Sequence, residues 1–143
     1  MSASAQHSRA VPYRLPVRVY YEDTDAGGVV YYANYLKYLE RARTEWLRSA
    51  GFDQGELAAT RNLLFTVRSL EIDYRAPARL DDRLEVEARV VRLGRASIDF
   101  AQAVVRDGAE LCSARVRVAC IDAGTFRPRT LPGELRQYLE RSP

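Results

Sequence analysis

The sequence predicts an α+β fold in which a five-stranded antiparallel sheet wraps around one long central helix. An apolar stripe with helical spacing runs from about residue 30 to residue 50. Alternation of apolar and polar residues, which is typical of strands, occurs once before this segment and four times after it. The last four strands have short connections, which favour an antiparallel meander. The helix must bury its stripe, and the sheet is the only partner that the pattern offers.

The first strand is expected over residues 14–21, where every second residue is apolar. A loop at residues 23–28 separates it from the long helix, predicted over residues 30–50. The stripe of this helix consists of Tyr31, Tyr35, Leu39, Ala42, Trp46 and Ala50. Gly51 is a natural terminator. A short second helix should follow, with Asp53 as its N-cap and Glu56 three residues later.

The remaining strands are expected at residues 64–75, 84–93, 96–106 and 110–122. In the first of these the apolar phase changes by one residue, which predicts a bulge near Arg68 and Ser69. Asp107 and Gly108 are typical of a two-residue hairpin turn. A short helix is expected over residues 132–141.

One domain is expected over residues 13–143, after a disordered tail of residues 1–12. The only histidine, His7, lies in this tail, which argues against any mechanism that needs an ordered histidine. The formal net charge of +3 is too small to predict a nucleic acid partner, but it would favour an anionic ligand.

Cys112 and Cys120 are predicted to be free, buried thiols, because they lie eight residues apart on one face of a strand, too distant to bridge. Free thiols suit a reducing cytoplasm. The chain shows no secretory signal at its start and no apolar run long enough to span a membrane, so a cytoplasmic location is expected. The cysteine and histidine spacing predicts no metal site.

The run YYEDTDAGGVVYYANYL, residues 20–36, has three interpretations. Asp23, Asp25 and Gly28 fit positions one, three and six of a calcium loop, but a ligand at position five and the glutamate at position twelve are missing. A purely structural loop before a helix is the second interpretation, because aspartate and glycine are good turn formers. The third is an active site.

An active site would combine the Asp25 carboxylate with the helix start that follows it. Unpaired N–H groups at a helix N-terminus suit an oxyanion, and glycines such as Gly28 let a ligand approach the backbone closely. The carboxylate can act as a nucleophile or as a general base on water. This combination fits acyl transfer, and it needs no histidine.

The run YYEDTDAGGVVYYANYLKYLERARTEWLRSAGF resembles the signature of hotdog-fold acyl-CoA thioesterases: D-x-D-x-G-x-V, an aromatic residue, then N-Y near the helix start. It is similar to two groups, the Tol-Pal-associated acyl-CoA thioesterases and the 4-hydroxybenzoyl-CoA thioesterases. The stretches SLEIDYRAPARLDD and VVRLGRAS also resemble this family, and the likeness covers residues 15–132. The predicted helix-in-sheet architecture agrees with a hotdog fold.

The resemblance implies that Asp25 is the catalytic carboxylate and that the backbone N–H of Tyr32 is the oxyanion donor. Asn34 is then structural and Tyr35 belongs to the core. The Tol-Pal-associated group usually has histidine at the position of Tyr32, whereas the 4-hydroxybenzoyl group has tyrosine. This departure bears on the subgroup and the substrate more than on the reaction.

The resemblance also implies substrate-binding residues. The family binds the nucleotide end of coenzyme A with the region that contains Arg92, Arg95 and Ser97, and arginine suits phosphate through its forked donors. Gly28 and Ser69 would lie along the path of the substrate. The alternatives are that the arginines are simply solvated on a hairpin and that Ser69 only forms the bulge.

The function implied by the resemblance is hydrolysis of a short-chain or aromatic acyl-CoA to the free acid and coenzyme A. No cofactor is implied, because coenzyme A is part of the substrate. A homodimer or homotetramer with the site at the subunit interface is implied, and so is a peripheral link to a cell-envelope complex. The rivals are a dehydratase, which would need an ordered histidine, and a non-catalytic acyl-CoA or envelope-complex binding module of the same fold.

Overall fold

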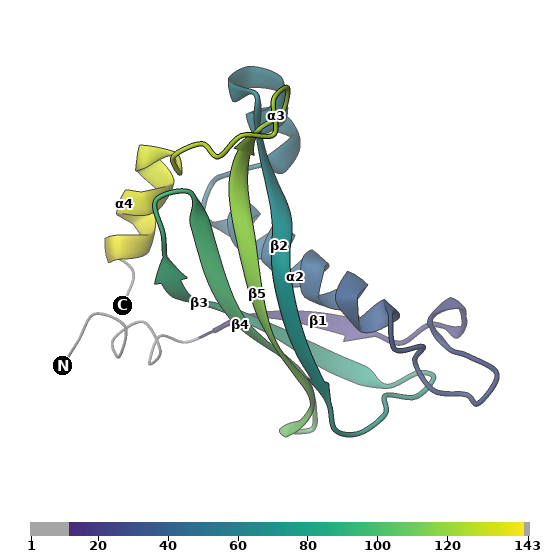
Figure 1. Cartoon of the computed structure of the whole chain (residues 1–143). Helices are drawn as coiled ribbons and strands as arrows, with labels where there is room; N and C mark the ends of the chain where they lie inside the picture. Colours follow the sequence, from purple (N-terminus) through teal and green to yellow (C-terminus); the bar gives the residue numbers. More distant parts are fainter. Residues whose placement is uncertain (1–11, 142–143) are drawn as a thin grey trace.

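The computed structural model describes residues 12–141, which form a curved antiparallel sheet with a long helix across one face (Figure 1). The strands are β1 (Tyr13–Arg18), β2 (Leu63–Tyr74), β3 (Arg83–Leu93), β4 (Ser97–Arg106) and β5 (Ala109–Asp122). The helices are η1 (Tyr21–Asp23, a 3-10 turn), α2 (Asn34–Ser49), α3 (Gln54–Arg61) and α4 (Gly133–Arg141). Residues 1–11 of the predicted tail, with His7, lie outside the described residues.

The strand order in the sheet is β1-β3-β4-β5-β2, and all neighbours are antiparallel. Strands β3, β4 and β5 form a meander, but the meander predicted for the last four strands is wrong, because β2 pairs with β5 instead of β3. The connection at residues 75–82 is too long for a tight hairpin, and it bonds to the chain beyond β1. The N–H of Asp81 donates to the Val19 carbonyl at 3.0 Å. Strand β2 therefore lies at one edge of the sheet.

Two local predictions for the sheet are confirmed. The register between β2 and β5 shifts between Val67 and Ser69, which is the expected bulge. Asp107 and Gly108 have φ values of 51° and 78°, and two successive left-handed residues are what a type I′ hairpin turn requires.

Helix α2 begins at Asn34, and the start predicted near Val30 is wrong. The N–H of Val30 donates to the Ala78 carbonyl at 2.8 Å, and Val30 also forms an antiparallel bridge with Thr24. These bonds hold Val30 in an extended conformation that a helix cannot include. Tyr31, which was assigned to the buried stripe, is 45% exposed.

In the rest of α2, Tyr35, Leu39 and Ala42 of the predicted stripe are buried, whereas Trp46 and Ala50 are only partly buried. Its buried residues are Tyr35, Tyr38, Leu39, Ala42 and Leu47. The inward residues of β3 and β5 are also buried, including Cys112 and Cys120, which are free thiols as predicted. Gln102 of β4, only 4% exposed, donates to the Leu39 carbonyl at 3.0 Å and so links the middle of the helix to the sheet.

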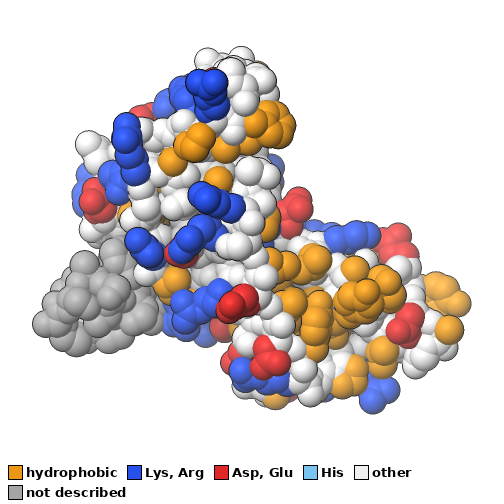
Figure 2. All heavy atoms as spheres, in the orientation of Figure 1, with side chains coloured by type: hydrophobic (Ala, Val, Ile, Leu, Met, Phe, Trp, Pro, Cys, Tyr) orange, Lys and Arg blue, Asp and Glu red, His pale blue; other side chains and the backbone are white. Residues whose placement is uncertain are grey.

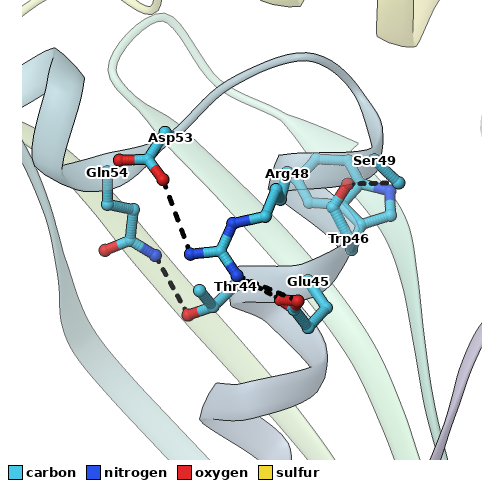
Figure 3. Close-up of polar contacts among 7 residues, drawn as sticks. All are labelled: Thr44, Glu45, Trp46, Arg48, Ser49, Asp53 and Gln54. Carbon is cyan, nitrogen blue, oxygen red and sulfur yellow. Dashed lines mark hydrogen bonds and ion pairs between the residues drawn. The ribbon is translucent and has the colours of Figure 1, made fainter.

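The junction between α2 and α3 is held by side-chain hydrogen bonds (Figure 3). Asp53 caps α3 as predicted, since its carboxylate accepts the N–H of Glu56 at 3.0 Å. Arg48 bonds to both Glu45 and Asp53. Gln54 donates to the Thr44 hydroxyl at 3.2 Å, which joins the first turn of α3 to α2.

None of the helices within residues 12–141 is long and apolar enough to cross a membrane.

Candidate active site

Asp25 lies on a narrow loop between β1 and α2. Thr24 and Val30 form an antiparallel bridge at the base of this loop. The N–H of Asp25 donates to the Val29 carbonyl at 2.8 Å, and the N–H of Gly28 donates to the Asp25 carbonyl at 3.0 Å. Gly28 has a φ of +77°, a conformation that side chains disfavour. The turn therefore fixes the backbone on both sides of Asp25.

The side chain of Asp25 is exposed, and only one of its two carboxylate oxygens accepts a hydrogen bond from the described residues. Its Oδ1 accepts the N–H of Gly27 at 2.8 Å, which restricts rotation of the side chain. Its Oδ2 makes no hydrogen bond or ion pair with any residue in the range 12–141. A side chain at position 27 would crowd this contact, because an added Cβ would lie 3.3 Å from Oδ1. The loop thus presents one oriented oxygen with a free lone pair.

Asp23 has a different role, as a scaffold. Its Oδ2 accepts the N–H of Tyr20 at 2.8 Å. Its backbone carbonyl accepts the N–H of Tyr31 at 3.0 Å and the side-chain N–H of Asn34 at 2.9 Å. Asn34 is therefore a structural residue, in agreement with the sequence interpretation, and it ties the start of α2 to the Asp25 loop.

The backbone N–H of Tyr32 belongs to a turn that precedes α2. This turn closes when the N–H of Asn34 donates to the Tyr31 carbonyl at 2.8 Å. The N–H groups of Tyr32 and Ala33 donate to no acceptor within the described part of the chain. Unpaired amides before a helix carry the partial positive charge of its N-terminus and suit an anion.

The side chain of Tyr32 belongs to a cluster of tyrosine rings. Tyr32 is 62% exposed, and its ring lies 4.8 Å from that of Tyr31 and 6.3 Å from that of Tyr74 between centroids. The Tyr74 hydroxyl donates to the Tyr32 carbonyl at 3.0 Å. The sequence interpretation missed Tyr74, because nothing in the strand pattern relates it to a turn 42 residues earlier.

Two of the predicted substrate-binding residues, Ser69 and Arg92, line one open hollow of about 690 Å³ on the sheet. Arg115 and Arg117 of β5 also line it, on the face turned away from α2, where Figure 2 shows Lys and Arg side chains gathered. Arg117 forms a two-bond pair with Asp99 at 2.8 and 3.0 Å. Arg92 and Arg115 make no side-chain hydrogen bond or ion pair with another residue of the range 12–141.

Arg95 and Ser97 lie outside this hollow, at the turn between β3 and β4. The Arg95 carbonyl accepts the N–H of Leu131 at 3.0 Å, and the side chain is exposed. The N–H of Gly94 donates to the Ser97 carbonyl at 2.9 Å, and a Cβ added at Gly94 would clash with the Ser97 hydroxyl oxygen. Ser97 therefore packs against the turn.

A second cavity, of about 260 Å³, lies between the second half of α2, the start of α3 and β2. Its lining includes the aromatic residues Trp46, Phe65 and Phe100, with Trp46 and Phe100 in edge-to-face contact at 5.1 Å. The guanidinium of Arg43 also lines it and donates to Gln102 at 2.8 Å. Burial lowers the pKa of Arg43. The cavity reaches the edge strand through Phe65, Thr66 and Val67.

Apolar side chains are exposed around the same edge of the sheet, and Figure 2 shows a hydrophobic patch there. They come from β2, from the turn before α2 and from its first turn: Val67, Leu70, Tyr74, Tyr31, Tyr32 and Leu36. A contiguous apolar patch on an edge strand is typical of an interaction surface.

Comparison with known proteins places this geometry in a family. Residues 19–139 match the model of the thioesterase-like superfamily. The acyl-CoA thioesterase YbgC of Haemophilus influenzae is 49% identical over 124 residues, which are 87% of this chain and 91% of that protein. The acyl-CoA thioester hydrolase YbgC of Escherichia coli O6:H1 is 49% identical over 121 residues, 84% of this chain and 90% of that protein.

A solved structure shows the same fold. The probable thioesterase from Bartonella henselae superposes with a TM-score of 0.82 at 38% identity, covering 85% of this chain and all of that one (100%). The family match spans nearly the whole described range. The two YbgC relatives and the Bartonella henselae structure indicate the same family. The chain therefore belongs to the thioesterase-like superfamily and is a hotdog-fold thioester hydrolase.

Proposed function

We propose that this protein hydrolyses acyl-CoA thioesters to the free acid and coenzyme A, with Asp25 as the catalytic carboxylate and the Tyr32 N–H as the oxyanion donor. The observation that carries this proposal is the unpaired Tyr32 amide, which lies in the turn between the Asp25 loop and α2. The names of the two YbgC relatives support the substrate class.

The chemistry follows from these two groups. The free oxygen of Asp25 attacks the thioester carbonyl carbon, or it takes a proton from a water molecule that attacks instead. In both cases the carbonyl oxygen becomes an oxyanion, which accepts a hydrogen bond from the Tyr32 N–H. The C–S bond then breaks and coenzyme A leaves as a thiolate. After direct attack, water hydrolyses the acyl-aspartyl anhydride and regenerates Asp25. In the general-base route, Asp25 is regenerated when the proton that it took from water passes to the thiolate. The reaction uses water alone and needs no cofactor.

The size of the cavity beside Trp46 supports the proposal that the substrate carries a small acyl group. Its volume of about 260 Å³ is just below the range of typical ligand pockets, which is about 300–1,000 Å³. Its walls combine the rings of Trp46, Phe65 and Phe100 with polar and charged side chains: Glu40, Arg43, Thr44, Gln54 and Thr66. The small volume favours a short-chain or aromatic acyl group over a long chain. The acyl group would enter from the edge of the sheet, where Val67 and Thr66 line the cavity.

The hollow that Arg92 and Arg115 line, on the face of the sheet turned away from α2, is the proposed binding site for the phosphates of coenzyme A. The guanidinium groups of Arg92 and Arg115 have unpaired donors, and Ser69 adds a hydroxyl. The carboxylates of Glu71 and Asp99 also line the hollow, and Asp99 is paired with Arg117. Arginine binds phosphate through two parallel N–H groups, which suits this ligand. Arg95 and Ser97 stand apart from this hollow, at the turn between β3 and β4. Gly28 remains part of the proposed substrate path because of its position next to Asp25.

The proposed enzyme works as a homodimer or a homotetramer. Strand β2 has one unpaired edge and exposed apolar side chains, and two copies of this edge can pair antiparallel about a two-fold axis. The acyl cavity opens at the same edge, so a second copy would complete its wall. A cytoplasmic location and a peripheral link to a cell-envelope complex belong to the same proposal, supported by the resemblance to the Tol-Pal-associated group.

The function is tested with purified protein and a panel of propionyl-CoA, benzoyl-CoA and palmitoyl-CoA, with release of free coenzyme A as the readout. Hydrolysis is expected, with kcat/KM higher for the first two substrates than for palmitoyl-CoA. Binding of all three without turnover would contradict the proposal and favour a non-catalytic acyl-CoA binding module.

A further inference from the structure

We propose that Tyr74 is a positioning residue for the oxyanion hole, because its hydroxyl holds the peptide between Tyr32 and Ala33 so that both neighbouring N–H groups face the thioester. This role depends on the proposed function. It adds to the Asp25 and Tyr32 assignments a residue at the end of β2, and it adds the N–H of Ala33 as a second donor.

The position of Tyr74 is fixed from two sides. It is the last residue of β2, and its ring lies edge-on to the rings of Tyr32 at 6.3 Å and Tyr35 at 5.4 Å. Tyr35 is itself buried, and its hydroxyl accepts the N–H of Ala78 at 2.9 Å. The Tyr74 hydroxyl is thereby directed at the Tyr32 carbonyl, 3.0 Å away.

The orientation of two successive peptides follows from these contacts. In a trans peptide the N–H and C=O groups point in opposite directions. The Tyr31 carbonyl accepts the N–H of Asn34, and the Tyr32 carbonyl accepts the Tyr74 hydroxyl. Both carbonyls are therefore engaged, and the N–H groups of Tyr32 and Ala33 are left without an acceptor among the described residues. Two adjacent amides in this arrangement form an anion-binding concavity.

Among the described residues, the Tyr74 hydroxyl makes the only side-chain hydrogen bond to the peptide between Tyr32 and Ala33. Without it, the peptide between Tyr32 and Ala33 can rotate, and a rotation that brings its carbonyl oxygen toward the developing oxyanion is repulsive. Burial raises the pKa of Tyr74, so the phenol stays protonated and remains a donor at neutral pH.

The test is Tyr74→Phe, which keeps the ring and removes the hydroxyl, assayed with benzoyl-CoA. The expected result is a fall in kcat of about tenfold, less than for loss of a direct oxyanion donor, with KM changed less than about twofold. Tyr13→Phe is the matched control, since it removes a tyrosine hydroxyl from β1, at the other edge of the sheet. It should leave kcat and KM within about twofold of wild type.

Both variants are compared at a temperature at which circular dichroism shows the native fold. A Tyr74→Phe enzyme with wild-type kcat would overturn the positioning role, and so would a rise in KM at constant kcat. Asp25→Asn is measured in parallel. If Asp25→Asn loses activity while Tyr74→Phe does not, only the role of Tyr74 fails. If Asp25→Asn is fully active, the proposed function fails.

Discussion

The side-chain amide of Asn34 donates a hydrogen bond to the backbone carbonyl of Asp23 at 2.9 Å. The first residue of α2 is thereby joined to the loop that presents Asp25, and the same carbonyl also accepts the N–H of Tyr31. The Asp23 carbonyl therefore links the two parts of the proposed site, which are the loop with the Asp25 carboxylate and the turn with the free N–H groups. Asp23 and Asn34 act on the site through the backbone, without contact to the reacting groups.

Replacing Asn34 by alanine should weaken this junction. The loss of one partly buried hydrogen bond is expected to lower the free energy of unfolding by about 1 kcal/mol. It should also lower kcat, because the Tyr32 turn loses an anchor. Urea unfolding and steady-state kinetics measure the two effects. Lys37→Ala, at an exposed position of the same helix, is the control and should change neither. Wild-type stability and kcat in Asn34→Ala would contradict the scaffold role.

The hairpin turn at Gly94 offers a test of whether Ser97 is structural. Gly94→Ala would place a Cβ against the Ser97 hydroxyl, and we expect a loss of about 1 kcal/mol in the free energy of unfolding from this overpacking. Adding Ser97→Ala removes the clash and should restore most of the loss. Ser97→Ala alone should leave KM for benzoyl-CoA unchanged. A severalfold rise in KM would instead support the contact with coenzyme A that the sequence resemblance implies.

Placing a charge on the edge strand should disrupt self-association. Leu70 is exposed on β2, so Leu70→Lys is expected to shift the protein from dimer or tetramer to monomer, because a lysine on an edge opposes strand pairing. Sedimentation velocity at a fixed protein concentration measures this shift. Leu80→Lys makes the same change at an exposed leucine outside β2 and should keep the wild-type assembly. An unchanged assembly in Leu70→Lys would show that β2 is not the interface.

Much of the fold was predictable because it depends on local patterns. The spacing of Tyr35, Leu39 and Ala42 defines the buried face of α2, and the one-residue phase change near Arg68 marks the bulge in β2. These signals arise within single elements. The left-handed turn at Asp107 and Gly108 is equally local, since aspartate and glycine tolerate the backbone conformation that the hairpin needs.

The errors concern contacts between distant segments. The pairing of β2 with β5 depends on the path of residues 75–82, which bond to the chain after β1, and no periodicity encodes that path. The start of α2 was misplaced because Tyr31 continues the apolar spacing, whereas the preceding Val30 bonds to Ala78 in the same connection. Tyr74 was missed for the same reason, since its contact with Tyr32 exists only once the sheet has formed.

The most direct test of the account is the turnover of benzoyl-CoA and propionyl-CoA by Asp25→Asn. Asparagine keeps the side-chain oxygen that accepts the Gly27 N–H, so the loop should stay intact while the nucleophile or base is lost. We predict a fall in kcat of about a hundredfold or more. Asp107→Asn makes the same substitution at a hairpin turn far along the chain and should retain wild-type kcat. A folded Asp25→Asn enzyme with wild-type kcat would contradict the catalytic role of Asp25.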